Sequence, residues 1–168
     1  MRLRRVLALS LFLLGFAACG GDEIKPDLPP IVGVLELPIA HRTGDPEPSG
    51  AARIELGTTE LREGGQTVFA LENGKVPAAE QQGHSLPKLK EKLAGKSALA
   101  ITMHAGVPYA TLARVLNTAL EAGAKTFAFK VRKQGSNTET GWLVLGDNHF
   151  VASAEDGKFP PAALLPWD

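Results

Sequence analysis

The most regular hydrophobic pattern in the chain lies between residues 98 and 133. Larger apolar side chains take alternate positions over residues 99–103, which is typical of a strand with at least one covered face. The period then changes, and apolar residues recur at helical spacing: Leu112, Val115, Leu116, Ala119 and Leu120. Alternation returns over residues 126–132. The pattern therefore predicts a strand, a helix and a second strand.

The ends of the predicted helix are marked by two residues. Pro108 suits the first helical turn, and Gly123 is well placed to end the helix in a left-handed conformation. We assign four residues to its solvent side: Arg114, Asn117, Thr118 and Glu121. A strand, a three-turn helix and a strand within so few residues predict two parallel strands joined by a right-handed crossover.

Weaker signals precede this unit. Residues 31–37 are apolar and partly β-branched, so they predict a strand that ends at Pro38. Residues 66–71 predict another strand, and Asn73-Gly74 after it favours a tight turn. Residues 53–61 fit either a short strand or a hairpin arm.

A first, shorter helix is expected over residues 86–93. Ser85 is its expected N-cap, and Gly95 lies near its end. Together these elements predict an α+β fold: a small mixed β-sheet with two helices packed on one face and a β-α-β crossover at its centre.

Residues 134–168 are expected to form a C-terminal β-hairpin and a proline-rich tail. The hairpin would pair residues 142–145 with residues 149–152 across Gly146-Asp147-Asn148. The tail, residues 159–168, holds three prolines among apolar side chains, and either packs along the domain or serves as a contact surface.

The start of the chain has the pattern of an export signal. Three arginines precede the apolar residues 6–16, and small residues then lead to Cys19. Residues 16–19 resemble the lipobox of bacterial lipoproteins, in which the cysteine is acylated and becomes the first residue after cleavage; Phe16 stands where leucine is usual. Residues 1–18 are then the signal peptide, and the polar residues 19–30 are a flexible tether.

Cys19 has three interpretations. It is lipidated, or it is a free thiol near an ordinary secretory cleavage site, or it belongs to an uncleaved signal anchor. It is the one cysteine of the 168-residue chain, so it has no partner for an intramolecular disulfide. Lipidation leaves no exposed thiol to explain, and it would hold the protein on a membrane.

Composition excludes one class of partner. The chain is 44% hydrophobic with a formal net charge of zero, as in a soluble domain with short appendages. A nucleic-acid-binding protein would show a basic excess, so no nucleic acid is expected.

The motifs of residues 31–133, in their order, resemble the periplasmic domain of the ExbD/TolR family. The resemblance rests on Val107-Pro108-Tyr109, the helix ending Ala122-Gly123, the strand after it, Asn73-Gly74 and Leu37-Pro38-Ile39-Ala40. It implies dimers and partners in biopolymer transport across the envelope. Family members carry an aspartate in a transmembrane helix, whereas residues 6–16 hold no ionisable residue, and His104 stands where the family commonly has aspartate.

Catalytic and metal motifs are missing from the sequence. His41, His84, His104 and His149 are far apart and lack a neighbour at ligand spacing, so we expect no metal and no cofactor. The sequence holds no nucleophile elbow, phosphate loop or dinucleotide fingerprint. We therefore expect no enzyme activity.

Two surfaces are candidates for binding. His104 and Tyr109 flank the turn at the carboxyl end of the central strand, where crossover sheets often leave a crevice; the alternative is that Tyr109 packs on the core edge and His104 is solvated. Lys88, Lys90, Lys92 and Lys96 either attract an anionic polymer such as the cell wall or only solvate their helix.

These observations predict an envelope lipoprotein that acts as a non-catalytic binding or accessory module. Its expected partners are a membrane, reached through the lipid on Cys19, and an envelope protein, peptidoglycan or a second copy of the chain. Gly20 after the cysteine favours the outer membrane, facing the periplasm. The alternative function is a secreted or envelope enzyme of unrecognised type.

Overall fold

The computed structural model of the chain describes residues 30–146. The predicted signal peptide and Cys19 lie outside the described residues. So do residues 149–152, which form the second arm of the predicted terminal hairpin, and the proline-rich residues 159–168.

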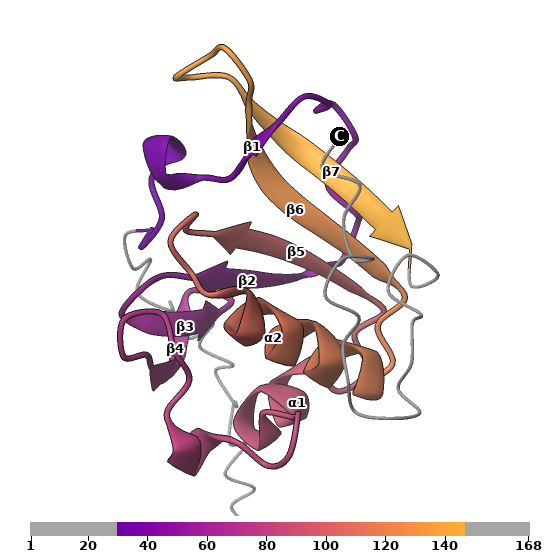
Figure 1. The fold of residues 1–168 in the computed structure, drawn as a ribbon. Helices are drawn as coiled ribbons and strands as arrows, with labels where there is room; N and C mark the ends of the chain where they lie inside the picture. Colours follow the sequence, from indigo (N-terminus) through magenta and orange to yellow (C-terminus); the bar gives the residue numbers. More distant parts are fainter. Residues whose placement is uncertain (1–29, 147–168) are drawn as a thin grey trace, which may run out of the picture.

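One mixed sheet organises the described residues (Figure 1). Its seven strands are β1 (Ile39–Ala40), β2 (Ala52–Leu56), β3 (Glu60–Glu63), β4 (Gln66–Ala70), β5 (Ala98–Met103), β6 (Thr126–Lys133) and β7 (Thr140–Gly146). The order is β1-β6-β5-β2-β3-β4, and β7 also pairs with β6. Strand β5 is parallel to β2 and β6, and β1 is parallel to β6, whereas the β2-β3, β3-β4 and β6-β7 pairs are antiparallel.

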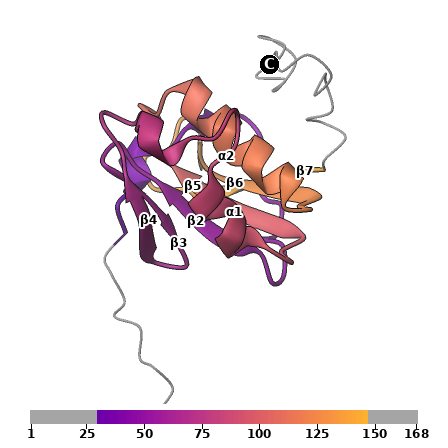
Figure 2. The same cartoon turned by 90° about the horizontal axis from the view of Figure 1, so that it is seen from below.

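The predicted α+β class, with its central crossover, is confirmed. Helix α2 (Tyr109–Glu121) joins the parallel strands β5 and β6, and Gly123 follows it at φ 99°. Helix α1 (Pro87–Leu93) lies beside α2, as Figures 1 and 2 show. Two 3-10 turns complete the element list: η1 (Val34–Glu36) and η2 (Ala78–Glu80).

The core lies between the helices and one face of the sheet. Paired residues of neighbouring strands share a face, so the register Ile54↔Ile101 and Leu99↔Phe127 aligns large apolar side chains beneath α2. The helices supply a matching set of buried residues: Leu89, Leu93, Leu112, Val115 and Leu116. The other sheet face carries Arg53 and Glu55 of β2, so it is polar.

The strand predicted over residues 31–37 is wrong. The chain instead forms η1, where the Glu36 carboxylate accepts a hydrogen bond from the Gly33 N–H and Leu37 N donates to Val34 O at 3.4 Å. These local bonds satisfy the backbone without a neighbouring strand. Pairing with β6 begins only around Pro38, whose carbonyl accepts from Arg132 N at 2.8 Å.

Other local predictions have mixed outcomes. The turn at Asn73-Gly74 is confirmed, because both residues have positive φ, at 53° and 75°. Residues 53–61 contribute to two strands, β2 and β3, of which β2 is an interior strand of the sheet. Ser85 is not the N-cap of α1: Leu86 takes that position, and the Ser85 hydroxyl donates to Glu121 at 2.6 Å.

The segment between β1 and β2 wraps around the β6-β7 side of the sheet. It passes Gly141, where a Cβ atom would lie 2.8 Å from Thr43 Cβ. Asp45 then pairs with the outer edge of β7, since its N–H donates to Trp142 O at 3.3 Å and its carboxylate accepts from Val144 N at 3.1 Å. This edge of the sheet is therefore covered by the chain itself.

Because β7 pairs with β6 over seven residues, the sheet continues beyond residue 133.

Glu121 joins the two helices and makes stability depend on pH. Hydrogen bonds from Lys90, Ser85 and Asn117, at 2.8, 2.6 and 2.8 Å, lower the pKa of Glu121 below its usual value of 4.5. A lowered folded pKa adds stability above the unfolded pKa, and this stability is lost as pH falls through the folded value. We therefore expect Glu121→Gln to be less stable than the parent at pH 7, by about 0.5 kcal/mol for this partly exposed ion pair.

Urea unfolding at several pH values measures this difference. The gap between the parent and Glu121→Gln should narrow below pH 4.5 and then close. Glu91→Gln is the matched control, because Glu91 is exposed on α1 and forms no ion pair with any residue of 30–146. A gap that stays constant down to strong acid would contradict the assignment.

Candidate functional site

The turn between β5 and α2, residues 104–108, is fixed by backbone hydrogen bonds. His104 N donates to Leu56 O at 2.9 Å, and Val107 N donates to His104 O at 3.0 Å. The start of α2 is bound to the Asn73-Gly74 turn, because the Thr111 hydroxyl donates a hydrogen bond to Gly74 O at 2.7 Å. The turn is therefore a preformed feature at the carboxyl end of β5.

His104 has a local partner within this turn. Its Nδ1 accepts a hydrogen bond from Gly106 N at 2.8 Å, so the imidazole folds back over the turn that follows it. No carboxylate or hydroxyl of residues 30–146 hydrogen-bonds to the ring. This geometry orients the ring without activating it as a base.

Tyr109 is the first residue of α2, and its side chain faces solvent. It is 44% exposed, and its hydroxyl has no hydrogen-bond partner within residues 30–146. Partial burial raises the pKa of Tyr109 above its usual value of 10. The phenol therefore stays protonated near neutral pH, where it offers an apolar ring and a free O–H donor. The structure places His104 and Tyr109 at opposite ends of the turn, with no hydrogen bond between them.

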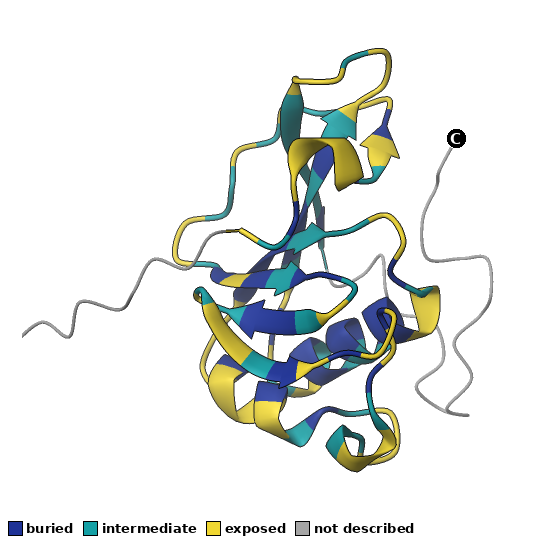
Figure 3. Ribbon diagram, turned by 90° about the vertical axis from the view of Figure 1, so that its left-hand side faces the viewer, coloured by how far each residue is buried: buried dark blue, intermediate teal, exposed yellow. Residues whose placement is uncertain are grey.

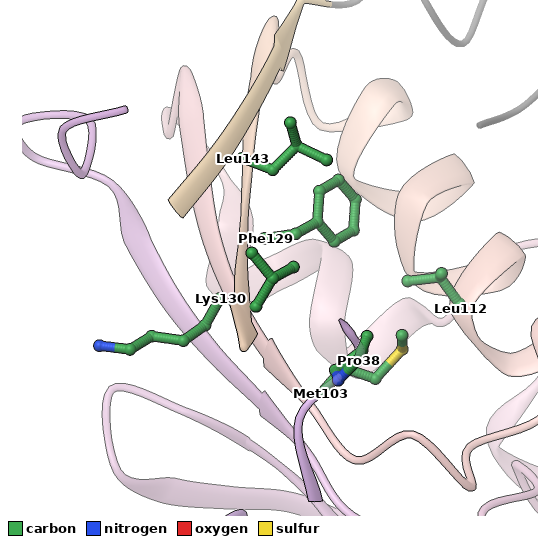
Figure 4. Close-up of a pocket in the computed structure, with 7 residues that line it drawn as sticks. Pro38, Met103, Leu112, Phe129, Lys130 and Leu143 are labelled. Carbon is green, nitrogen blue, oxygen red and sulfur yellow. The ribbon is translucent and has the colours of Figure 1, made fainter. Parts of the chain in front are cut away.

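An apolar pocket lies beside this turn, between α2 and the sheet (Figure 4). Its accessible wall is entirely apolar, and the residues that line it are Pro38, Met103, Leu112, Phe129, Lys130, Val131 and Leu143. Figure 4 shows the Lys130 side chain pointing away from the other labelled residues. Met103 immediately precedes His104, and Leu112 lies one helical turn beyond Tyr109, so the pocket adjoins the predicted binding turn.

Exposed apolar side chains occur on both elements that flank the turn, η1 and α2. Within residues 30–146 the exposed large hydrophobic residues are Val34, Leu35, Ile39 and Tyr109, and they come from η1, β1 and the start of α2. Figure 3 shows the exposed η1 beside the sheet. Ala105 N donates to Glu36 O at 2.7 Å, which fixes η1 against the turn. Ile39 pairs with Arg132 and so belongs to the polar sheet face.

We call the group formed by Val34, Leu35, Pro38, Met103 and Tyr109 the β5-end surface. Sequence reasoning identified only Tyr109 of these five. Val34 and Leu35 were missed because η1 was predicted as a strand, which would have paired them with neighbours. Pro38 could have indicated that residues 34–37 lie outside the sheet, because proline interrupts strand pairing.

The polar sheet face carries a second, different groove. Its lining residues are Glu47, Arg53, Ile54, Glu55, Ala100, Thr102, Lys130 and Trp142. Arg53 pairs with Glu47 at 2.9 Å, and Lys130 Nζ lies 5.0 Å from the centroid of the Trp142 ring. The charges of this groove thus have partners within the chain.

The lysines of α1 are also partly engaged. Lys88 pairs with Glu80 at 2.7 Å, and Lys90 pairs with Glu121 at 2.8 Å. Two of the four lysines expected to attract an anionic polymer are thus paired with carboxylates. The local charge of this helix is lower than its lysine count indicates.

Neither metal chemistry nor membrane spanning is visible in the described part. Within residues 30–146, no three His, Cys, Asp or Glu side chains are grouped so as to hold a metal ion. In the same range no helix has the length and hydropathy needed to cross a bilayer. His149 and Cys19 lie outside the described residues.

Comparison with known proteins finds no match for this chain. No family model, no curated protein and no solved structure is similar to it.

Proposed function

We propose that the chain is a non-catalytic binding module of the bacterial cell envelope, anchored to a membrane through a lipid on Cys19. The observation that carries this proposal is the β5-end surface, where exposed apolar residues of η1 and α2 flank a turn that adjoins an apolar pocket. Such clustering is typical of protein-interaction sites, whereas scattered exposed apolar residues need no explanation.

The chemistry of this surface favours a protein partner. Leu35 is 69% exposed and Tyr109 is 44% exposed, so both have much apolar area left to bury on association. Tyrosine is enriched at energetically important interface positions, and its free hydroxyl adds a directional hydrogen bond. A polysaccharide such as peptidoglycan would instead require many polar groups, which this surface lacks.

Binding is better supported than catalysis. A general base must be free to reach the proton that it removes, whereas His104 Nδ1 is engaged by Gly106 N. The raised pKa of Tyr109 makes its phenolate scarce at neutral pH. His104 and Tyr109 therefore give little support to the alternative of an envelope enzyme.

The relation to the ExbD/TolR family is part of the proposal. The parallel β5-α2-β6 unit agrees with the order of motifs on which the resemblance rests. Crossover units of this kind occur in many unrelated folds, so their presence alone does not identify a family. On this relation, we expect proteins of an energy-transducing envelope complex among the partners.

A crosslinked pull-down of the full chain from its native envelope tests the function. Leu35→Asp and Tyr109→Asp place a carboxylate on the β5-end surface, where an apolar partner would have to desolvate it. We expect each variant to lose at least about tenfold of the captured partner, as for a truncated hot spot of roughly 1.4 kcal/mol or more.

The matched control is Ser97→Asp, which places a carboxylate at an exposed position just before β5, at the opposite end of that strand from this surface. It should capture the partner as well as the parent does, and all three variants should unfold at similar urea concentrations. Equal capture by Leu35→Asp, Tyr109→Asp and the parent would refute the proposed site. A Cys19→Ala variant tests separately whether capture needs the membrane anchor.

A further inference from the structure

The β5-end surface keeps apolar side chains exposed within residues 30–146. The accessible wall of the pocket beside it is apolar, and Leu35 and Tyr109 are exposed on η1 and α2, the two elements that flank the turn. In the described part of the chain no segment covers these two side chains. An exposed patch of this kind favours association with an apolar segment.

The chain itself contains a segment of matching chemistry. Residues 159–168 read Phe-Pro-Pro-Ala-Ala-Leu-Leu-Pro-Trp-Asp, so they join two aromatic rings and two leucines with three prolines. Proline restricts the backbone to extended, polyproline-like conformations, and such segments dock on apolar grooves at a low entropic cost. Since proline lacks an N–H, this segment is poorly suited to extend the sheet as another strand.

The position at which the described chain stops brings this segment within reach. Gly146 lies three residues beyond Leu143, which lines the pocket, so the two are about 10 Å apart along β7. The intervening residues 147–158 can extend over as much as about 40 Å. Gly146 pairs with Thr126 at the amino end of β6, and this reach exceeds the length of β7, so residues 159–168 can return along β7 to the pocket beside the β5-end surface.

We propose that residues 159–168 dock on the β5-end surface as an extended segment and compete there with an outside partner. The regulatory part of this inference rests on the proposed function, whereas the docking itself does not. A tethered segment of this length has an effective concentration near the millimolar range. Even a weak apolar contact would then be substantially occupied, and a partner would have to displace it.

Methionine provides a selective probe of this docking. The sequence contains two methionines, Met1 and Met103, and Met103 lines the pocket. In the full chain in lipid nanodiscs, labelled with methyl-¹³C methionine, a docked aromatic ring should displace the Met103 methyl resonance from its usual position. Trp167→Ala and Leu165→Asp should each return that resonance toward the usual position.

The matched control is Ala152→Asp, which adds a charge within residues 147–158 without altering the apolar segment. It should leave the Met103 resonance of the parent unchanged. If Trp167→Ala and Leu165→Asp also leave it unchanged, the docking is refuted. A displacement that disappears on dilution would show that a second copy occupies the surface, which also overturns the inference.

Partner capture separates the two proposals. Under competition, Trp167→Ala should increase capture by about tenfold while Leu35→Asp abolishes it. If the Met103 resonance responds to the tail variants but Leu35→Asp captures normally, the docking stands and the proposed function fails. If Leu35→Asp loses capture but the tail variants leave the Met103 resonance unchanged, the proposed function stands and the docking fails.

Discussion

Replacing Phe127 with alanine is expected to destabilise the domain by about 3–5 kcal/mol, the usual cost of removing a buried aromatic ring. Phe127 is fully buried on β6, and it pairs with Leu99 of β5 and Leu145 of β7. Its ring therefore belongs to the face where the crossover helix meets three strands. A loss of this size is a large part of the 5–15 kcal/mol that typically stabilises a domain.

Urea unfolding followed by circular dichroism measures this loss. The control is Thr126→Ala on the same strand, because Thr126 is only half-buried. Its unfolding midpoint should remain close to that of the parent. If Phe127→Ala costs less than about 1.5 kcal/mol, the site collapses around the cavity more completely than core sites usually do.

The crossover could be predicted because all its signals are local. Alternation over residues 99–103, the helical stripe after Tyr109 and the positive φ available to Gly123 each depend only on neighbouring residues. Parallel pairing then follows from the right-handed connection rule. The structure agrees with these predictions almost residue by residue over β5, α2 and β6.

The amino-terminal part could not be predicted because its pairing is distant. Strand β1 has two residues, and its partners Arg132 and Lys133 lie more than 90 positions along the chain. No period can be recognised in two residues, so the apolar run before Pro38 looked like the strand. The course of the β1-β2 segment around β7 depends on Asp45, which by sequence is merely one acidic residue in a loop.

The candidate site shows the same division. The turn with His104 and Tyr109 follows from the end of a strand and the start of a helix, so local pattern was enough to place it. Pro38, just before β1, and Leu143 of β7 reach the pocket only through the sheet order. A pocket built from β5, α2, β6, β7 and the residue before β1 has no signature in any one stretch of sequence.

The predicted exposure of Thr118 is wrong, although it was based on a local pattern. Helical spacing assigned it to the solvent side of α2, yet it is fully buried. Its side of α2 faces α1, and its Oγ1 accepts a hydrogen bond from the buried Leu86 N at 2.9 Å and donates to Arg114 O at 2.7 Å. Leu86 is the N-cap of α1 and has no side-chain cap, so a threonine from the other helix satisfies an N–H at the start of α1.

Thr118→Val should therefore cost about 1–3 kcal/mol, because it keeps the shape but leaves Leu86 N buried without an acceptor. Thr118→Ser retains the hydroxyl and should lose only about 1 kcal/mol through the missing methyl group. Urea unfolding gives the energies, and amide exchange at Leu86 reports the bond itself. Exchange should accelerate in the valine variant but not in the serine variant. If the valine variant matches the parent in both measurements, burial of Leu89 and Leu93 alone holds α1 against α2.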